Sequence, residues 1–532
     1  MRVGILRPTE PGALPMSPPL RIALGADHGG FADKRRLIER LRGLGYRVLD
    51  LGAYVAEASD YPIPGRRVAE AVARGRADLG VLLCRSGNGM AIVANKVPGA
   101  RAAIATNVRL AELARRHNDA NVLVLGSDFM EDPADRVLEA FLSASPEDGR
   151  HRRRVDMIRR REAVAASTLP THQLLAQGQS PWVDDISDQM LASGLLERMI
   201  RAEGLRGLTS NPSIFEKAIT SGQGRYRAEL ARMKTQGLDA EAAYERLTTE
   251  DIARAADLLR PIYDETGGDD GFVSLEVLPA YAHDEESTVK EARRLFEALG
   301  RPNVMIKVPG TEAGLRAFRR LTALGVNINV TLIFARSLYG RVAEAYLAGL
   351  ADRLAAGGDV SRLRSVASVF VSRIDSAVDK RLEALASPPA RALLHTIAIA
   401  NARLIYADFK SIFDGEAFAE PAAHGAAVQR PLWGSTSTKD PRLSDVLYVE
   451  ELIGPETVNT IPLATLQAFL DHGRVRGATL EENLDAARER IDVLPRLGVD
   501  LEAVCAELQT AGVRAFADSF DKLFAAIQAA LA

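Results

Sequence analysis

Short apolar runs alternate with longer amphipathic stretches along most of this chain, in one series from residue 20 and a second from residue 181. A short apolar run bounded by turn residues is typical of a buried strand, and apolar residues at helical spacing predict a helix. In the first series the runs predict five strands, within 21–25, 46–51, 79–84, 101–105 and 121–125. Strands that alternate with helices predict a doubly wound, Rossmann-like parallel sheet, whose ligands bind at the carboxyl ends of the strands.

The second series is longer and contains eight apolar runs. They lie at 182–186, 206–209, 272–277, 304–308, 326–333, 366–371, 429–435 and 457–461. Helical stretches such as 240–260 and 285–299 separate most of them, so the pattern predicts an α/β fold of the (β/α)₈ TIM barrel type over 181–532. We expect residues 1–19 to be a disordered or extended segment, and residues 163–180, which show no clear period, to be a linker.

Composition narrows the classes of function. The chain has 532 residues, which is too long for one core. Its formal net charge of −3 argues against a nucleic-acid binder, and no apolar run is long enough to span a membrane. Cys84 and Cys505 lie far apart, so we expect no disulfide and a cytoplasmic location. Residues 1–19 lack the arrangement of a secretory signal, and Met16 is an alternative start.

One predicted strand of the barrel, 304–308, carries a lysine inside a β-branched apolar run. Burial of an ammonium is costly, so Lys307 tends to lose its proton there, and a neutral amine is a nucleophile for carbonyl carbons. By itself the run also fits a lysine that reaches water at the strand end or pairs with a carboxylate.

Polar residues also fall in or just after most of the other predicted barrel strands. They are Asp184, Thr209, Ser210, Asn211, Ser274, Glu276, Asn329, Thr331 and Ser368. In a barrel the carboxyl ends of the strands converge on one face, so the set predicts a site around Lys307, although each residue alone fits a capping or core role. The set supplies an amine, two carboxylates and hydroxyl groups but no grouping of metal ligands, so we expect neither a metal nor a cofactor.

In the first series, Cys84 closes a predicted strand and precedes a loop that contains Gly87 and Gly89. Backbone N–H groups of such a loop can converge on one anion and activate a nearby thiol; the alternative is a small core residue. The other candidates near strand ends are Asp27, His28, His117, Asn118 and the basic cluster 150–154. That cluster fits either phosphate binding or a solvated helix end.

Five stretches of the first series, 25–31, 84–89, 94–99, 117–121 and 149–151, occur in an order that resembles ribose-5-phosphate isomerase type B over about residues 20–162. The resemblance implies that Cys84 is the base that moves a proton between C2 and C1, with help from Ser86, and that amides of the Gly87–Gly89 loop stabilise the enediolate. The other implied residues are His117 for ring opening, Asp27, His28 and Asn118 for the sugar, and Arg150 and Arg154 for the phosphate. Arg85 departs from the family, which often has glycine after the cysteine.

In the second series, the stretches 207–215 and 304–314 resemble the two signature stretches of transaldolase, and the resemblance covers about residues 171–532. It implies that Lys307 forms a Schiff base and that Asp184 is the general acid/base for the C4 hydroxyl. A pair that positions a water corresponds to Glu276 and Thr331. The residues implied in holding the substrate are Asn211, Asn329, Ser368, Arg373 and Ser435. Lys439 lies in a loop where other family members have arginine, and we suggest that it supplies that charge.

The two resemblances together imply a bifunctional pentose-phosphate enzyme that binds sugar phosphates, without a nucleic-acid or membrane partner. One half would interconvert ribose 5-phosphate and ribulose 5-phosphate. The other would move a dihydroxyacetone unit from sedoheptulose 7-phosphate or fructose 6-phosphate to an aldose phosphate. Because the isomerase family is typically dimeric, with a site shared between subunits, we expect a homodimer through the first half.

Two alternative functions stay open. The first half is an inactive module for binding or dimerisation in one of them, which Arg85 favours. In the other the second half is a fructose 6-phosphate aldolase, although those enzymes tend to have tyrosine where this chain has Phe370. Allose and galactose phosphates are alternative substrates for the isomerase half.

Overall fold

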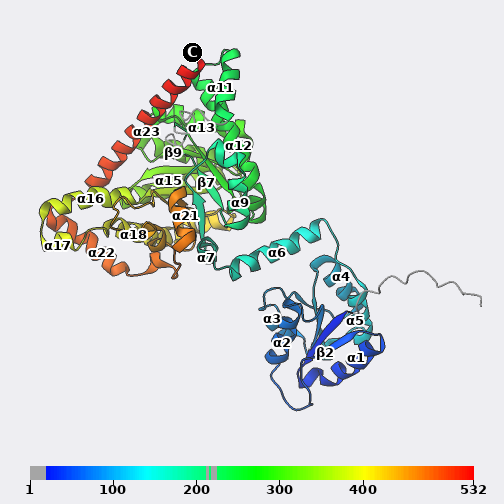
Figure 1. The fold of residues 1–532 in the computed structure, drawn as a ribbon. Coiled ribbons are helices and arrows are strands. Elements are labelled where there is room, and N and C mark those ends of the chain that lie inside the picture. Colours follow the sequence, from blue (N-terminus) through cyan, green and yellow to red (C-terminus); the bar gives the residue numbers. More distant parts are fainter. Residues whose placement is uncertain (1–19, 211–214, 217–224) are drawn as a thin grey trace, which may run out of the picture. The chain divides into compact units, whose positions relative to one another are not determined.

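The computed structural model describes residues 20–210, 215–216 and 225–532 of the chain, so the expected N-terminal segment 1–19 lies outside the described residues. The chain divides between Ala166 and Ser167 into two units (Figure 1). Each unit has its own hydrophobic core and is described by itself.

The first unit is built on a parallel sheet in the strand order β2-β1-β3-β5-β4. Its strands are β1 (Arg21–Ala26), β2 (Arg47–Asp50), β3 (Leu79–Cys84), β4 (Ala102–Ile104) and β5 (Val122–Gly126). Its helices are α1 (Phe31–Gly43), α2 (Pro62–Ala73), α3 (Asn88–Ala94), α4 (Val108–Asn118), α5 (Ala134–Ser143) and α6 (Arg150–Ala166). Alternate strand residues, such as Ala23 and Leu24, enter two apolar clusters, with α2 and α3 on one face and α1, α4 and α5 on the other. The predicted doubly wound five-stranded sheet is confirmed.

The second unit is a closed barrel of eight parallel strands, which confirms the predicted (β/α)₈ fold. Its strands are β6 (Gln179–Val183), β7 (Gly207–Thr209), β8 (Phe272–Glu276), β9 (Val304–Pro309), β10 (Ile328–Ile333), β11 (Ser365–Phe370), β12 (Gln429–Gly434) and β13 (Thr457–Ile461). The first of these begins three residues before the predicted run 182–186 and ends at Val183. Gln179 and Ser180 are polar but buried, and Pro181 separates them from the apolar residues, so the run alone did not reveal this part of the strand.

Helices surround the barrel (Figure 1). They include α7 (Pro170–Ala176), α8 (Asp188–Ala192), α9 (Leu195–Ala202), α11 (Arg225–Thr235), α12 (Ala240–Glu265), α13 (Glu285–Leu299), α14 (Glu312–Leu324), α15 (Arg336–Ala355), α16 (Ser372–Leu385), α17 (Pro388–Arg391), α18 (Ile397–Phe413), α19 (Glu416–Ala423), α20 (Leu447–Glu451), α21 (Leu463–His472), α22 (Leu484–Val493) and α23 (Leu501–Leu531). The expected linker 163–180 contains the end of α6, all of α7 and the start of β6, because Pro170 starts a helix too short to show a period. No helix among the described residues is long and apolar enough to cross a membrane.

Inward-facing residues fill the barrel in two layers. At one end an apolar layer combines Met305 of β9 and Phe272 of β8 with neighbours from other strands, and Tyr263 of α12 packs edge-on against Phe272. Two residues further along β9, on the same face of the strand, lies Lys307. The polar layer therefore sits on a dry apolar floor at the carboxyl ends of the strands.

Candidate active sites

Lys307 lies in a row of inward-facing polar side chains. The strand register pairs it with Glu276 of β8 and with Asn329 of β10. Its Nζ donates to the Ser210 carbonyl oxygen at 2.9 Å and lies 3.2 Å from Glu276 Oε2, and only 4% of the residue is exposed. Of the interpretations open for this lysine, the structure supports a buried amine beside a carboxylate and excludes one that extends into water.

The environment of Glu276 acts on its carboxyl group in opposing ways. Burial raises the pKa of Glu276, the Lys307 charge opposes this, and the Asp184 charge adds to it. Thr331 Oγ1, on the neighbouring strand β10, is buried and has no hydrogen-bond partner within the described residues, so it can hold a water or a substrate oxygen.

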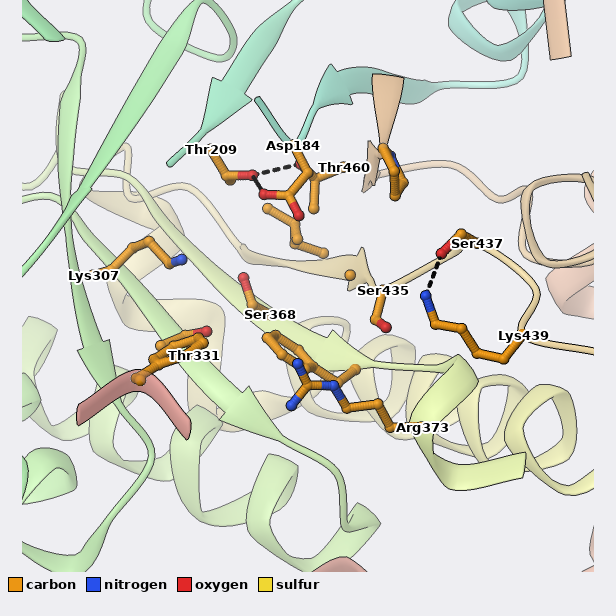
Figure 2. Close-up of a pocket in the computed structure, with 15 residues that line it drawn as sticks. Asp184, Thr209, Lys307, Thr331, Ser368, Arg373, Ser435, Ser437, Lys439 and Thr460 are labelled. Atoms are coloured by element: carbon orange, nitrogen blue, oxygen red, sulfur yellow. Dashed lines mark hydrogen bonds between the residues drawn. The ribbon is translucent and has the colours of Figure 1, made fainter. Parts of the chain in front are cut away.

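A cavity of about 360 Å³ opens above this layer, and Lys307 and Thr331 lie at one end of it. Figure 2 shows Arg373, Ser437 and Lys439 on the opposite side. A cavity of this volume holds a small phosphorylated molecule. The arrangement separates an amine at one end from cationic side chains at the other.

Asp184 faces the cavity from the residue after β6. Thr209 Oγ1 donates to Asp184 Oδ1 at 2.8 Å and lies 2.7 Å from Thr460 Oγ1 of β13 (Figure 2). One hydroxyl can donate to the carboxylate and accept from its neighbour, so the two threonines orient Asp184. The side chain of Asp184 is thereby held at the wall of the cavity.

The cationic end is formed by α16 and the loop after β12. Burial lowers the pKa of Arg373, and burial together with the Arg373 charge lowers the pKa of Lys439. Lys439 Nζ donates to Ser437 Oγ at 2.8 Å, and Ser435 Oγ lies 3.0 Å from Ser372 Oγ. Two cations this close favour a doubly charged anion such as a phosphate between them.

The remaining residues of the barrel site fall into three sets. Ser368 lines the cavity and donates to Asn329 Oδ1 at 2.6 Å, so Asn329 contacts Ser368 on the side away from the cavity. Asn211 lies outside the described residues. Sequence reasoning missed Thr460, which a polar residue inside the run 457–461 signals, and Phe516, for which the residues around the site gave no signal.

In the first unit, Cys84 ends β3 and is buried, with its Sγ accepting the Gly87 N–H at 3.2 Å. Gly87 has a φ of 80°, which glycine adopts without strain, and it precedes α3. An added Cβ at Gly89 would lie 2.5 Å from the Tyr61 ring, so the chain has no room for a side chain there. The exposed Ser86 lies inside this loop. The thiol therefore faces the short turn before α3, and Gly89, predicted as part of the loop, lies in the first turn of that helix.

Asp27 and His28 lie at the end of β1, which is paired with β3, so they lie with Cys84 at the carboxyl ends of the strands. Asp27 Oδ1 accepts the N–H groups of Gly29 and Gly30 at 2.9 and 3.1 Å and so caps the turn His28–Gly30. An added Cβ on Gly29 would lie 2.7 Å from Arg85 Cγ, so the stem of Arg85 lies against this turn.

His117 and Asn118 lie at the amino ends of the strands, on the opposite side of the sheet from Cys84. They end α4, which leads into the start of β5, whereas Cys84 pairs with Gly126 at the end of β5. A strand of five residues such as β5 separates its amino end from its carboxyl end by about 17 Å. The sequence placed Cys84 at the end of one strand and His117 before another, and the structure does not bring the two residues together within one chain.

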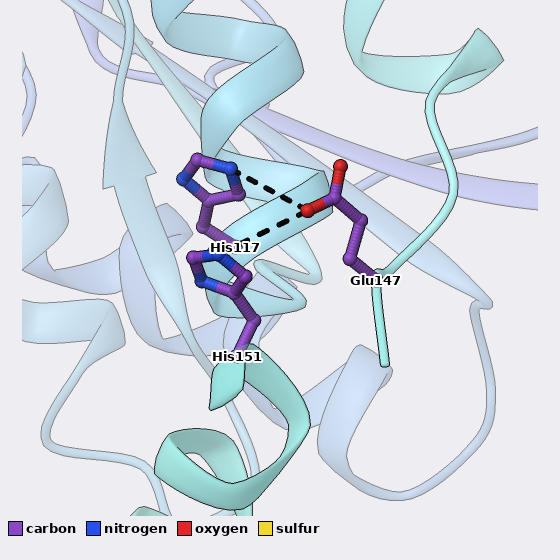
Figure 3. Close-up of side chains that lie close together, drawn as sticks. All are labelled: His117, Glu147 and His151. Atoms are coloured by element: carbon purple, nitrogen blue, oxygen red, sulfur yellow. Dashed lines mark ion pairs between the residues drawn. The ribbon is translucent and has the colours of Figure 1, made fainter. Parts of the chain in front are cut away.

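A compact cluster surrounds His117 (Figure 3). Its ring stacks on His151 of α6 with centroids 3.9 Å apart and 10° between the planes. Glu147 Oε2 lies 3.6 Å from His117 Nε2 and 3.9 Å from His151 Nε2. Arg116 Nε donates to Glu147 at 2.7 Å, and this hydrogen bond lowers the pKa of Glu147. Burial, then the charges of His117 and Arg150, lower the pKa of His151.

These three side chains are of kinds that bind transition metals, a grouping that the sequence did not reveal. The lone pairs of nearly parallel stacked rings lie in separate planes and do not converge on one point. Arg116 is bonded to Glu147, and Arg150 Nε donates to His151 Nε2 at 3.2 Å, so positive charge opposes a cation. Arg150 and Arg154, both exposed, begin α6 beside the cluster and suit an anion instead.

The fold and the cavity place the second unit among (β/α)₈ barrels with a buried lysine at the carboxyl ends of the strands. Residues 181–527, more than half of the chain, match the family model Transaldolase/Fructose-6-phosphate aldolase, and residues 22–158 match Ribose/Galactose Isomerase. The chain therefore belongs to the transaldolase/fructose-6-phosphate aldolase family, with an isomerase-family region before the barrel, and both resemblances are confirmed.

Individual relatives match one part of the chain each. The transaldolase of Frankia alni is 47% identical over 358 residues, which cover 67% of this chain and 96% of the relative. Transaldolase 1 of Streptomyces coelicolor is 47% identical over 368 residues, 69% of this chain and 96% of the relative. A solved structure of Clostridium thermocellum ribose-5-phosphate isomerase B is 42% identical, covering 28% of this chain and 100% of that one, with a TM-score of 0.27.

Proposed function

We propose that this chain is a bifunctional enzyme of sugar-phosphate metabolism. Its barrel transfers a dihydroxyacetone unit from sedoheptulose 7-phosphate or fructose 6-phosphate to an aldose phosphate. Its first unit interconverts ribose 5-phosphate and ribulose 5-phosphate. The observation that carries the transfer activity of the barrel is the buried Lys307 at one end of a cavity whose other end holds Arg373 and Lys439.

The barrel's chemistry follows from the positions of three groups. The neutral Lys307 amine attacks the ketose C2 carbonyl, and loss of water forms an iminium. Asp184 takes the proton of the C4 hydroxyl, the C3–C4 bond breaks, and its electron pair neutralises the iminium to an enamine while the aldose leaves. The enamine then attacks the incoming aldehyde, and Asp184 returns the proton. Glu276 and Thr331, whose hydroxyl has no hydrogen-bond partner in the part of the chain that the structure describes, are suited to hold the water released and later needed for hydrolysis.

Lys439→Ala is expected to raise the KM for fructose 6-phosphate with little change in kcat. A charge-assisted hydrogen bond is worth about 1.5–3 kcal/mol, so the rise should be roughly ten- to hundredfold. Steady-state kinetics with erythrose 4-phosphate as acceptor measure it. Lys439→Arg should retain tight binding. Lys410→Ala is the control, because it removes a lysine of α18 that is paired with Glu481. An unchanged KM in Lys439→Ala would remove this residue from the phosphate site.

In the first unit we assign Cys84 as the base and Ser86 as its assisting hydroxyl. The Gly87 N–H that points at the sulfur, with its loop neighbours, is suited to stabilise the negative charge of the thiolate and the enediolate. His117, Asn118, Arg150 and Arg154 would open the sugar ring and bind its phosphate. Because these residues lie at the amino ends of the strands and Cys84 at the carboxyl ends, the proposal requires a second copy that brings its own His117 to this chain's Cys84.

A subunit-complementation experiment tests this homodimer. Cys84→Ala and His117→Ala chains should each be inactive in ribose 5-phosphate isomerisation. In a mixed dimer one site has both mutations and the other has neither, so the purified mixed dimer should have about half of the wild-type rate, and an unsorted random mixture about a quarter. Coexpression of the two variants with different tags, followed by assay of the doubly tagged dimer, measures this. Purified mixed dimers without activity would contradict a shared site.

An inactive first unit remains the second candidate, because the stem of Arg85 occupies space beside the Asp27–His28 turn. The presence of Cys84 with its N–H donor supports activity over this alternative. A simple aldolase activity of the barrel is less well supported, because those aldolases tend to have tyrosine where this chain has Phe370. Phe370 lines the cavity, and its ring packs 5.3 Å from the Arg373 guanidinium.

A further inference from the structure

Phe516, on the C-terminal helix α23, lies in the barrel site although it comes from a segment more than two hundred residues beyond Lys307. It lines the cavity, its ring centroid lies 5.9 Å from Lys307 Nζ, and it is 9% exposed. A ring in this position presents an apolar surface to whatever is bonded to the amine. It also removes space that water would otherwise fill.

The helix that carries Phe516 is fastened next to the reacting residues. Gln509 Nε2 donates to the Gly310 carbonyl oxygen at 2.7 Å, one residue beyond the end of β9. Gly512 lies over Leu332, the residue after Thr331, where an added Cβ would come within 2.9 Å of a side-chain carbon. Gln509, Gly512 and Phe516 are spaced by three and four residues, so they share one face of α23. That face is therefore pressed onto β9 and β10 at the depth of the site.

One turn beyond Phe516 the same face is anchored in the core. Phe520 packs edge-on against Tyr244 of α12 with centroids 5.3 Å apart, and Phe524 contacts the same ring at 5.5 Å. Burial, and then the nearby charge of Glu276, raise the pKa of Tyr244, so this aromatic group backs the Glu276 side of the site. The position of Phe516 is thus set by contacts on both sides of it along the helix.

We propose that Phe516 determines whether the barrel acts as a transferase or as an aldolase, by excluding water from the enamine on Lys307. This inference rests on the proposed Schiff-base function. After the C3–C4 bond breaks, a water proton can add to C3 of the enamine. A second water then attacks C2 of the resulting iminium and releases free dihydroxyacetone and the Lys307 amine. Transfer requires that the acceptor aldehyde reach C3 before this happens, and an apolar ring over the amine slows the competing path.

The experiment measures free dihydroxyacetone formed from fructose 6-phosphate alone, relative to transfer onto erythrose 4-phosphate, in the full chain. Phe516→Ala should raise this ratio on the order of tenfold, a change of about 1.4 kcal/mol in the relative barriers. Phe516→Leu, which keeps most of the apolar volume, should give a smaller rise. Ile527→Ala truncates a buried apolar side chain of the same helix three turns beyond Phe516, and it should leave the ratio unchanged.

The outcomes separate this inference from the function on which it rests. A wild-type chain that transfers nothing contradicts the proposed function itself. A wild-type chain that transfers, with a ratio unchanged in Phe516→Ala, overturns the role of Phe516 alone. An equal rise in Ile527→Ala would assign the effect to loosening of α23 and would also overturn it. If Phe516→Ala does not fold, Phe516→Leu decides, because an unchanged ratio in that variant contradicts the inference.

Discussion

Lys307→Ala is expected to abolish transfer of the dihydroxyacetone unit while leaving isomerisation of ribose 5-phosphate intact. Loss of a covalent nucleophile lowers kcat on the order of 10⁴-fold or more. The substitution removes the only group in this cavity that we assign to bond formation with C2, whereas the first unit has its own core and reacting groups. Transfer kinetics with fructose 6-phosphate and erythrose 4-phosphate measure the loss.

Covalent trapping gives the same prediction a direct readout. Borohydride treatment of the wild type with fructose 6-phosphate should add a reduced dihydroxyacetone unit to Lys307, detectable by peptide mass, and Lys307→Ala should acquire none. Glu276→Gln removes the carboxylate 3.2 Å from the amine and keeps the side-chain volume, so it should still be trapped, but more slowly. Transfer that survives in Lys307→Ala, or an adduct on another residue, would refute the assignment.

Cys84→Ala is expected to have the converse effect, with isomerisation lost and transfer retained. A general base typically contributes 10²–10⁴-fold, so we expect a fall of about that size in the rate of ribulose 5-phosphate formation. The variant removes one buried atom, the acceptor of the Gly87 N–H, and changes no other residue of the turn before α3. The most informative background is Lys307→Ala, in which any remaining turnover of sugar phosphate belongs to the first unit.

The contrary result has a definite meaning. If the Lys307→Ala chain folds and converts no ribose 5-phosphate, the first unit is an inactive module and Arg85 is the first residue to test. Arg85→Gly would then remove the stem that lies against Gly29, and recovered isomerisation would attribute the inactivity to this one substitution. Cys505→Ala is the matched thiol control, because Cys505 is a buried cysteine on α23, which belongs to the second unit.

The fold was largely predictable from the sequence because strand and helix periods are local properties of the chain. Each of the eight apolar runs predicted for the barrel lies on a strand, and Lys307 and Glu276 face inward as their runs indicated. The exception is β6, where a buried glutamine and serine precede a proline. Burial of these residues depends on partners far along the chain, such as the Leu452 carbonyl oxygen that accepts from Gln179 Nε2 at 2.6 Å.

Two features of the sites depended on tertiary structure alone. Cys84 ends one predicted strand and His117 precedes another, so a parallel sheet already puts them at opposite ends of the strands. Only the packing of α4 against α6 stacks the ring of His151 on that of His117, with Glu147 beside both. Phe516 reads in the sequence as one apolar position of an amphipathic helix. Its place beside Lys307 follows from the packing of α23 on β9 and β10, through contacts between residues about two hundred positions apart.

The sequence by itself therefore determined the two folds, the chemical groups available and, through motif resemblance, most of the residues of both sites. The three-dimensional arrangement decided which of those groups meet within one chain, which require a second copy, and which apolar side chain covers the amine. The physical reason is that a side chain's type and period are properties of its own segment. Its distance to a reacting atom is set by packing between segments that the chain order does not relate.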